Sequence, residues 1–358
     1  MLFTYIIYNV ILLFVLIFGY YVKVSSTKLS EYICRTIVFL SIVIPASIRK
    51  GIGTDYWSYV GLYQWYSTNS DEHEIGFQLL GKLMNFFGFS YQSFIASLAI
   101  LAFAPVCYYV PKRNFYPFIV IYFFLLFLSC ISTTRQAISI ALVTCGIFAL
   151  YKEKGTMKYL FCVVLAFFFH YSSILYFPIL LFKNIKFSNT NIYICLGIIL
   201  MIMSRADFID NLFASSKFQD SPYGVYATIG QYNREAEVGT GLGIILNLML
   251  PCLFLMLNRK ISKYYDHVGF FVFLTMLFVT SYFLASKVHI FGRLMGCFIF
   301  LPAFLIHPVC KTLSLKYNNF LIFLFFIIYL ILYEKMIAVS QSSLGNGLGI
   351  SPYTTIFD

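Results

Sequence analysis

The sequence predicts an all-α polytopic membrane protein, and three observations carry this prediction. Of the 358 residues, 60% are hydrophobic and only 11% are charged, whereas soluble chains carry about 25% charged residues. The mean hydropathy of +0.83 leaves too few polar side chains to cover a water-exposed globule. Apolar runs close to the ~18 to 20 residues that cross a bilayer as a helix recur along the chain.

Eleven apolar runs are the expected membrane helices, and we expect about 10–12 such helices in total. We expect them to form one integral membrane domain over residues 1–358. A β-barrel is excluded, since its strands would alternate apolar and polar residues. In chain order the runs are Leu2–Tyr21, Tyr32–Ile48, Phe94–Val110, Phe115–Ile131, Ala137–Tyr151, Leu160–Leu181, Ile192–Met203, Leu242–Leu257, Val268–Ala285, Leu294–Ile306 and Phe320–Tyr333.

The run Leu160–Leu181 does not fit a simple alternation of sides. Basic residues flank it at both ends, although it is only about one helix long, and it contains His170 followed by polar residues. One interpretation is a broken, re-entrant helix pair over residues 159–182 with its apex near His170. Irregular backbone at that depth requires protein or water around it. The alternative is a single crossing, with Ile192–Met203 failing to span.

Basic residues set the expected orientation. Fifteen of the 25 Lys and Arg residues fall in alternate short loops, which the positive-inside rule places in the cytoplasm. The net charge of +11 therefore reflects topology and does not indicate nucleic-acid binding. The predicted outward segments are 49–90, 132–136, 205–240, 287–293 and the tail 334–358.

Two outward segments combine cations with glycine or hydroxyl residues. Arg49 and Lys50 precede Gly51, Gly53, Asp55 and Tyr56, and the glycines permit a turn or close approach to a ligand. Arg135 and Gln136 follow Ser132–Thr134 at the start of a helix, where the free N–H groups favour an anion, and a guanidinium suits phosphate oxygens. The alternatives are a solvated turn with an ion pair at Arg49 and lipid-headgroup contact at Arg135.

Two further groups carry titratable residues. His170 at the predicted break is able to act as a base or to donate to a phosphate, whereas a lone histidine in an apolar run is more often a satisfied core residue. Lys287, His289 and Arg293 form a cationic cluster without a nearby acid, which indicates an anionic ligand or lipid headgroups. Together these groups predict a cationic outward cavity that fits a lipid-linked pyrophosphate.

Acidic residues of the outward loops are few. Asp55, Glu74 and Asp220 are candidates for hydroxyl recognition or proton transfer. Asp71–Glu74 is interpreted as a solvated loop in preference to a cation site, since hard cations need several well-placed oxygens. No cysteine spacing resembles a metal site, and no nucleotide-binding fingerprint is present, so we expect neither metal nor cofactor.

At this point the residues resemble a family. Arg49-x-Gly51-x-Gly53-Thr54-Asp55-Tyr56 with Tyr59, Glu74-x-Gly76, Thr134-Arg135-Gln136, His170-x-Ser172 and Pro352-Tyr353 follow one another in order. This pattern resembles the EpsG-like branch of the Wzy-type O-antigen (polysaccharide) polymerases and spans most of the chain. The resemblance implies a GT-C-like polyprenyl-phosphate glycosyltransferase architecture with an outward-facing cavity.

The resemblance further implies a metal-independent enzyme of the bacterial inner membrane with its active site facing the periplasm. Such enzymes join undecaprenyl-pyrophosphate-linked repeat units by glycosyl transfer to the non-reducing end of the incoming repeat. The implied partners are the lipid-linked oligosaccharide as donor and acceptor, membrane lipid, and a chain-length regulator protein. No nucleic acid is expected.

The roles expected of these residues follow from the negative charge that develops on the departing pyrophosphate. Arg135 and Arg293 are expected to stabilise the departing pyrophosphate, and the base is either Asp55 or His170. Substrate binding is expected from Arg49, Lys50, Tyr56, Glu74, Gln136, Lys287 and His289. Two alternatives from other classes remain: a flippase or transporter of the same lipid-linked oligosaccharide, which broken helices also suit, and an O-antigen ligase, which would share the cationic site.

Overall fold

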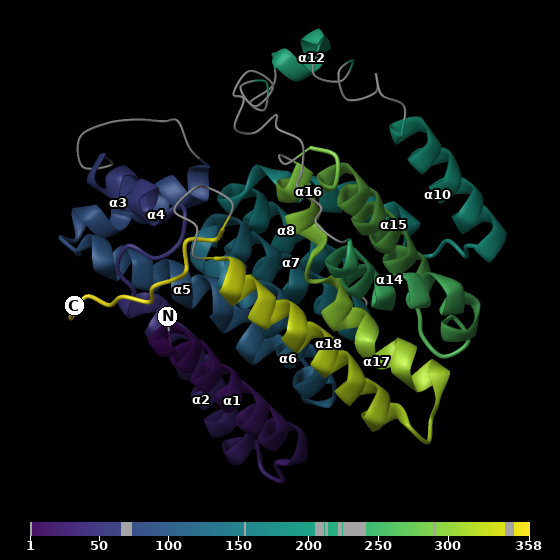
Figure 1. The fold of residues 1–358 in the computed structure, drawn as a ribbon, viewed down its shortest axis with the longest axis horizontal. Helices are drawn as coiled ribbons and strands as arrows, with labels where there is room; N and C mark the ends of the chain where they lie inside the picture. The colour runs from purple at the N-terminus through teal and green to yellow at the C-terminus, as the bar shows by residue number, and fades with distance from the viewer. Residues whose placement is uncertain are drawn as a thin grey trace. The chain divides into compact units, whose positions relative to one another are not determined.

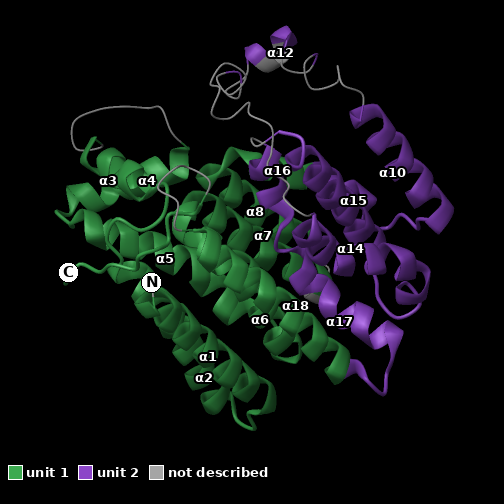
Figure 2. Ribbon diagram, viewed as in Figure 1, with its two compact units in different colours: residues 1–177, 319–358 green, residues 178–318 purple. Residues whose placement is uncertain are grey.

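The computed structural model describes residues 2–65, 74–153, 155–204, 211, 214–220, 224, 241–288, 291–340 and 347–358. Within these ranges the chain is helical and contains no strand apart from one isolated bridge between Arg49 and Thr355. The predicted fold class, an all-α polytopic membrane protein, is confirmed. The helices group into two compact units, which Figure 2 colours separately: residues 1–177 with 319–358, and residues 178–318.

Unit 1 holds the first helices of the chain and the last one, which Figure 1 labels. Those long enough to span a membrane are α1 (Leu2–Val24), α2 (Lys28–Ile48), α5 (Tyr91–Tyr109), α6 (Lys112–Ser132), α7 (Thr134–Glu153) and α18 (Asn318–Val339). Shorter elements are α3 (Tyr56–Trp65), α4 (Ile75–Phe86), α8 (Thr156–Phe169), the 3₁₀ turn η1 (Tyr171–Leu175) and the start of α9 (Tyr176–Ile179).

Helix α6 forms the centre of unit 1. In α6, 89% of the 18-residue apolar window is buried, compared with 33% in α1. Helices α1, α5 and α7 pack against α6, and α2 packs against both α1 and α5. The outer faces of α1 and α2 expose large apolar side chains such as Leu13, Phe14 and Ile44. An apolar outer face around a buried central helix is the arrangement expected in lipid.

Unit 2 contains the 3₁₀ turn η2 (Leu180–Phe182), α10 (Asn189–Met203), α12 (Ser216–Gln219), α14 (Leu242–Ile261), α15 (Val268–Ala285), α16 (Phe291–Phe298) and α17 (Leu301–Leu313). Helix α15 packs against α10, α14 and α16, and α14 packs against α17. Asn258 Nδ2 donates to Asn189 Oδ1 at 2.6 Å, which ties α14 to the start of α10.

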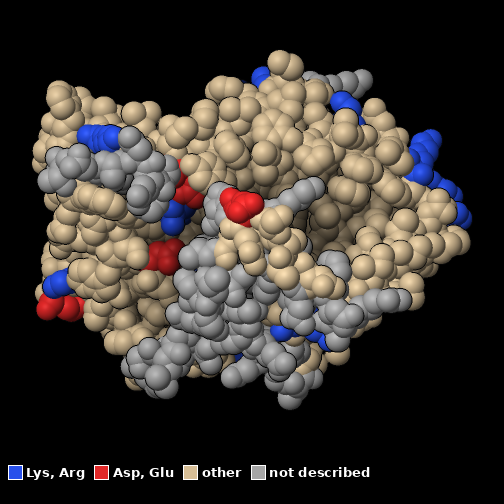
Figure 3. All heavy atoms as spheres, turned by 90° about the horizontal axis from the view of Figure 1, so that it is seen from above, with Lys and Arg blue, Asp and Glu red and all other residues tan. Residues whose placement is uncertain are grey.

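The described residues contain fewer uninterrupted membrane-spanning helices than the eleven apolar runs predict. Among the described residues, eight helices are long and apolar enough to cross a membrane, or nine if the bent pair α16 and α17 counts as one. The run Ile192–Met203 lies in a helix of only 15 residues, and α16 and α17 meet at a 48° bend. Acidic and basic side chains are sparse on the face that Figure 3 shows.

The run Leu160–Leu181 is broken at His170, as one interpretation predicted. Helix α8 ends at Phe169, and His170 takes an extended conformation before η1 begins. The Tyr159 hydroxyl donates to the carbonyl oxygen of Tyr176 at 2.7 Å, although the two residues are 17 positions apart. In one straight helix they would be separated by about 25 Å, so the chain turns back on itself at this break.

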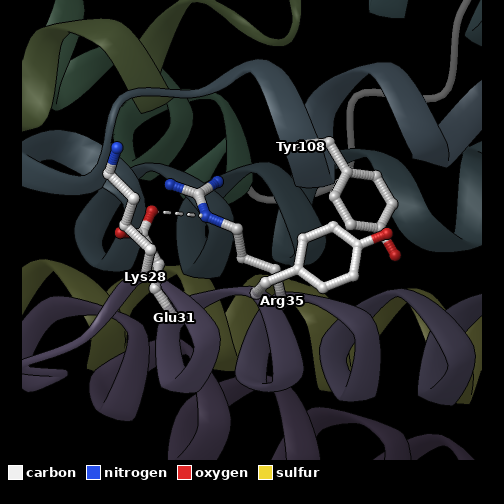
Figure 4. Close-up of a pocket in the computed structure, with 5 residues that line it drawn as sticks. Lys28, Glu31, Arg35 and Tyr108 are labelled. Carbon is white, nitrogen blue, oxygen red and sulfur yellow. Dashed lines mark hydrogen bonds and ion pairs between the residues drawn. The ribbon is translucent and has the colours of Figure 1, made fainter.

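The alternating loops of unit 1 gather at two opposite ends of its helices. At one end the α1–α2 loop meets the α5–α6 loop, since Lys112 Nζ donates to the Ser25 carbonyl oxygen at 2.5 Å. Nearby, Arg35 of α2 pairs with Glu31 (Figure 4) and donates to the Cys107 and Val110 carbonyl oxygens at the end of α5. This is the end predicted to be cytoplasmic. The other end carries the predicted outward residues.

Candidate functional site

The candidate site lies where the C-terminal ends of α2, α6 and α8 meet the N-terminal end of α7. Three contacts establish this convergence. Arg49, after α2, donates to Thr134 Oγ1 at 3.4 Å. The backbone N–H of Thr54 donates to Ser132 Oγ at 3.1 Å. Glu74 bonds to both Arg135 and His170. Residues from four segments far apart in the sequence thus share one helix-end surface.

Glu74 is the centre of the site. It immediately precedes α4, is only 7% exposed, and uses both carboxylate oxygens. Oε2 accepts from Arg135 Nη1 at 2.5 Å, and Oε1 accepts from His170 Nδ1 at 3.1 Å. The contacts cross 61 and 96 residues of sequence. A predicted hydroxyl-recognition residue therefore connects two of the predicted catalytic residues.

The electrostatic surroundings keep Glu74 ionised. Burial by itself would raise the pKa of this carboxyl group, because it disfavours the charged form. The hydrogen bond from His170 and the positive charge of Arg135 outweigh burial and lower the pKa of Glu74 to about 2. The group is consequently a carboxylate, and an acceptor only, throughout the physiological pH range.

Gly76 explains how Glu74 reaches His170. A Cβ atom at Gly76 would lie 2.9 Å from the carbonyl oxygen of Phe168 and 3.1 Å from its carbonyl carbon. Both atoms belong to the backbone of α8, which cannot yield as a flexible side chain would. The absence of a side chain lets the first turn of α4 pack directly on the end of α8. The spacing Glu74-x-Gly76 is thus a packing requirement for the contact between Glu74 and His170.

Arg135 sits in the first turn of α7 against two aromatic rings. Its guanidinium carbon is 5.7 Å from the ring centroid of Tyr59 and 5.4 Å from that of Phe77. The backbone N–H of Arg135 points to the Tyr59 hydroxyl at 3.5 Å, and its side chain is 25% exposed. The guanidinium is therefore paired with Glu74 and still accessible, beside the N-terminal end of a helix that favours anions.

His170 is oriented by its bond to Glu74. A carboxylate only accepts, so the Nδ1 of His170 carries the proton of this 3.1 Å bond. The second ring nitrogen, Nε2, has no protein partner among the described residues, and the side chain is 27% exposed. His170 is therefore not a fully satisfied core histidine. A fixed Nδ1–H tautomer leaves Nε2 with a lone pair that is able to take a proton.

Asp55 approaches the same group through Tyr59. The Tyr59 hydroxyl donates to Asp55 Oδ2 at 3.3 Å, and Thr54 Oγ1 donates to Oδ1 at 3.4 Å. Tyr59 is buried, and burial together with the Asp55 charge raises the pKa of its phenol to about 12. Asp55 is partly exposed, so it is a second accessible acceptor beside Arg135 and Glu74.

Arg49 lies beneath the site. It is 1% exposed, and Nη1, Nε and Nη2 donate to the Ala46 and Ile52 carbonyl oxygens and to Thr134. Burial lowers the pKa of this guanidinium to about 10, although nearby tyrosines oppose the effect. The interpretation of Arg49 as a solvated turn residue is therefore wrong. Its bonds close the end of α2 and hold the following loop.

The neighbours of Arg49 differ in exposure. Lys50 is exposed and Tyr56 is buried. The Tyr56 hydroxyl donates to Gln92 Oε1 at 3.1 Å, and Gln92 Nε2 in turn donates to the Arg49 carbonyl oxygen at 3.1 Å. Gln136, directly after Arg135, is half-buried.

The C-terminal tail supports the loop that carries Asp55. Gly53 has a positive φ of 96°, and a Cβ there would lie 2.5 Å from the Ile131 carbonyl oxygen, so only glycine fits. The Gly53 N–H donates to the Gly349 carbonyl oxygen at 2.8 Å. Tyr353 Oη donates to the Pro45 carbonyl oxygen at 2.8 Å. Tyr353 is buried and thus contributes by packing under the site, whereas Pro352 is exposed.

The predicted residues Lys287 and Arg293 belong to unit 2. Lys287 is exposed after α15 with its ammonium 5.8 Å from the Phe283 ring centroid, and Arg293 is exposed on α16. His289 and the cluster Asp71–His73 lie outside the described residues. Cooperation between Arg135 and Arg293 remains a prediction. In the part of the chain that the structure describes, no group of three His, Cys, Asp or Glu side chains is placed to hold a metal ion.

Sequence reasoning gave no role to three residues of this site. Tyr59 bridges Asp55 and Arg135, Phe77 packs under the guanidinium, and Gly76 lets α4 approach α8. A signal existed for Tyr59, which follows Asp55 by four positions and faces it across one helical turn. No comparable local pattern marks Phe77.

The fold and the site define a multi-pass membrane protein with an ionised cluster at the ends of several helices. A family model described as the EpsG family matches residues 32–355. The chain belongs to this family, and its membership supports a function of the polysaccharide-polymerase type in general. No curated protein and no solved structure matches the chain.

Proposed function

We propose that this chain is a polysaccharide polymerase: a metal-independent glycosyltransferase of the bacterial inner membrane that acts at the periplasmic face. The growing glycan leaves its undecaprenyl pyrophosphate and is transferred to the non-reducing sugar of an incoming lipid-linked repeat unit. One observation carries the proposal. Arg135, Glu74 and His170 come from three separate elements into direct contact at a partly exposed helix end.

Arg135 is assigned to the departing diphosphate. Negative charge grows on the phosphate oxygens as the sugar–oxygen bond breaks, and preorganised donors stabilise this charge most effectively. A planar guanidinium matches two phosphate oxygens at once. The N-terminal end of α7 adds partial positive charge at the same place. Arg293 and Lys287 are proposed to bind anionic groups of the substrate.

His170 is assigned to the attacking hydroxyl. Its Nδ1–H is held by Glu74, so Nε2 is the atom that takes the hydroxyl proton as the new glycosidic bond forms. The contact between Glu74 and His170 resembles the pairs in which a carboxylate orients a catalytic histidine. Asp55 is the weaker candidate for this base, because its carboxylate already accepts from Tyr59 and Thr54. We assign Asp55 to binding of sugar hydroxyl groups.

The other predicted substrate residues take supporting roles. Lys50 and Gln136 border the site from the α2 and α7 sides and are proposed to contact sugar or phosphate. Arg49 and Tyr56 are proposed to act by holding the loop that carries Asp55, since their polar atoms bond to protein groups. His289 is proposed to act with Lys287.

The test is reconstitution of the purified protein with a synthetic undecaprenyl-pyrophosphate-linked repeat unit as the only substrate, with and without EDTA. The expected result is a ladder of products longer than one repeat, unchanged by the chelator. A transporter would leave the repeat unextended, and a ligase would require a separate acceptor lipid. Absence of any extended product from stably folded protein would contradict the proposal, and loss of the ladder in EDTA would contradict metal independence.

A further inference from the structure

We propose that Glu74 is a positioning residue that serves both halves of the transfer reaction: one carboxylate oxygen holds Arg135 and the other orients His170. This inference rests on the proposed function. It gives Glu74 a different role from direct recognition of a sugar hydroxyl. The donor-binding cation and the acceptor-activating base are then held at a fixed separation by a single side chain.

The exposure of the three residues supports this division of roles. The Glu74 side chain is 9% exposed, whereas Arg135 and His170 are 25% and 27% exposed. Both Glu74 oxygens already accept charge-assisted hydrogen bonds. A substrate arriving from outside therefore meets the guanidinium and the imidazole, and not the carboxylate behind them.

Glu74 is also an internal counter-ion for Arg135. A partly buried guanidinium without a nearby anion would be costly in the empty site, and the carboxylate supplies that anion. An arriving diphosphate must share the guanidinium with Glu74. The carboxylate therefore repels the donor to some extent, which weakens donor binding. It also keeps Arg135 in place, which favours turnover.

The second function of Glu74 follows from where the proton goes during glycosyl transfer. The acceptor hydroxyl oxygen forms a bond to the anomeric carbon, and its proton moves to Nε2 of His170. The anomeric carbon–oxygen bond breaks, and its electron pair stays on the diphosphate oxygen. The imidazolium that results keeps its Nδ1–H bond to Glu74, whose negative charge stabilises it. The proton then leaves to the diphosphate or to water.

The variant Glu74→Gln separates these effects. It keeps the size of the side chain and an oxygen able to accept from Nδ1, but it removes the negative charge. We expect kcat to fall by about 10²-fold because the imidazolium loses its counter-charge. We expect KM for the lipid-linked donor to fall by about threefold to tenfold because a like charge near the diphosphate is gone. A purely structural role predicts no fall in KM together with the fall in kcat.

The matched control is Glu31→Gln. Glu31 also pairs with an arginine, Arg35, at 2.9 Å, but at the opposite end of unit 1. We expect this variant to leave both kcat and KM within about twofold of the wild type. If Glu74→Gln does not fold, Glu74→Asp keeps the charge on a shorter side chain, and kcat should fall without a fall in KM.

A binding measurement separates failure of this inference from failure of the proposed function. Titration with undecaprenyl pyrophosphate alone should show tighter binding to Glu74→Gln than to the wild type. Unchanged or weaker binding would overturn the counter-ion role, and unchanged kcat would overturn the orienting role. Tighter binding by the variant, with no chain growth even in the wild type, would overturn the proposed reaction and leave the counter-ion role standing.

Discussion

The two ends of unit 1 each contain an arginine paired with a glutamate, and they use the pair differently. Arg35 is 5% exposed and pairs with Glu31 one turn away on the same helix. Its other two donors bond to the Cys107 and Val110 carbonyl oxygens at 2.8 and 2.9 Å, and its guanidinium stacks 4.3 Å from the Phe115 ring centroid. Arg35 therefore closes the end of α5.

Arg135 has the opposite arrangement. Its glutamate partner lies 61 residues away in the sequence, its side chain is a quarter exposed, and its guanidinium donates to Glu74 through Nη1. A buried arginine whose three guanidinium nitrogens all bond to protein groups holds structure. A guanidinium paired with one carboxylate and facing outward marks an arginine available to a ligand. Arg49, whose three guanidinium nitrogens donate to two carbonyl oxygens and a hydroxyl, falls in the first class.

The largest expected effect on chain growth comes from Arg135→Ala. Removing a donor that faces the developing charge costs about 10²- to 10³-fold in turnover, so polymer should be undetectable while the protein stays in the membrane. Arg135→Lys should recover only part of the activity, since an ammonium lacks the planar fork. The readout is product length on a gel together with membrane yield. Wild-type chain lengths in the alanine variant would contradict the assignment.

A smaller effect is expected from Gly76→Ala. The new Cβ would meet the Phe168 carbonyl oxygen at 2.9 Å and push α4 away from α8, which moves Glu74 away from His170. We expect turnover to fall about tenfold and stability by about 1–3 kcal/mol. The control is Gly61→Ala in the middle of α3, where a Cβ meets no atom within 4 Å. Equal activities of the two variants would mean that the close approach is not needed.

Arg35→Ala should leave the turnover of the folded protein unchanged but lower its stability. Truncation leaves Glu31 without its partner and two carbonyl groups without donors, at a cost of about 3–5 kcal/mol. Thermal unfolding in detergent measures the loss, and turnover per folded molecule measures the activity. If Arg35→Ala had normal stability but reduced turnover, the structural role assigned to Arg35 would be contradicted.

The smallest effect is a pH dependence of stability. Since the pKa of Glu74 in the folded protein is lowered from 4.5 to about 2, its charge stabilises the fold fully above about pH 4.5. That contribution is lost as the pH falls toward 2. The stability difference between wild type and Glu74→Gln should therefore shrink as the pH falls from 4.5 toward 2. A difference that stays the same over this acidic range would contradict the ion pair.

Much of the fold follows from local patterns. The apolar runs locate α1, α2, α5, α6 and α7 to within a few residues, because a span must bury its backbone in its own hydrogen bonds. The break at His170 was also predictable from polar residues inside an apolar run. Helices α3 and α4 were not predicted, since they are short, lie within the polar segment 49–90 and depend on packing for their stability.

The site was predictable as a list of residues but not as a set of contacts. Arg135, His170, Asp55 and Glu74 stand out because charges are rare in this chain and fall at helix ends. Their pairing was not predictable, because the bonds of Glu74 cross 61 and 96 residues and depend on how α4 packs on α8. Arg49 resembles Arg135 in the sequence, and only its burial separates the two.

A map of the protein with a bound undecaprenyl-pyrophosphate-linked repeat unit tests the central claim most directly. The account predicts phosphate oxygens within hydrogen-bond distance of the Arg135 guanidinium and the His170 imidazole facing the acceptor hydroxyl. A diphosphate bound away from Arg135, for example beside Arg35 at the opposite end of unit 1, would contradict it.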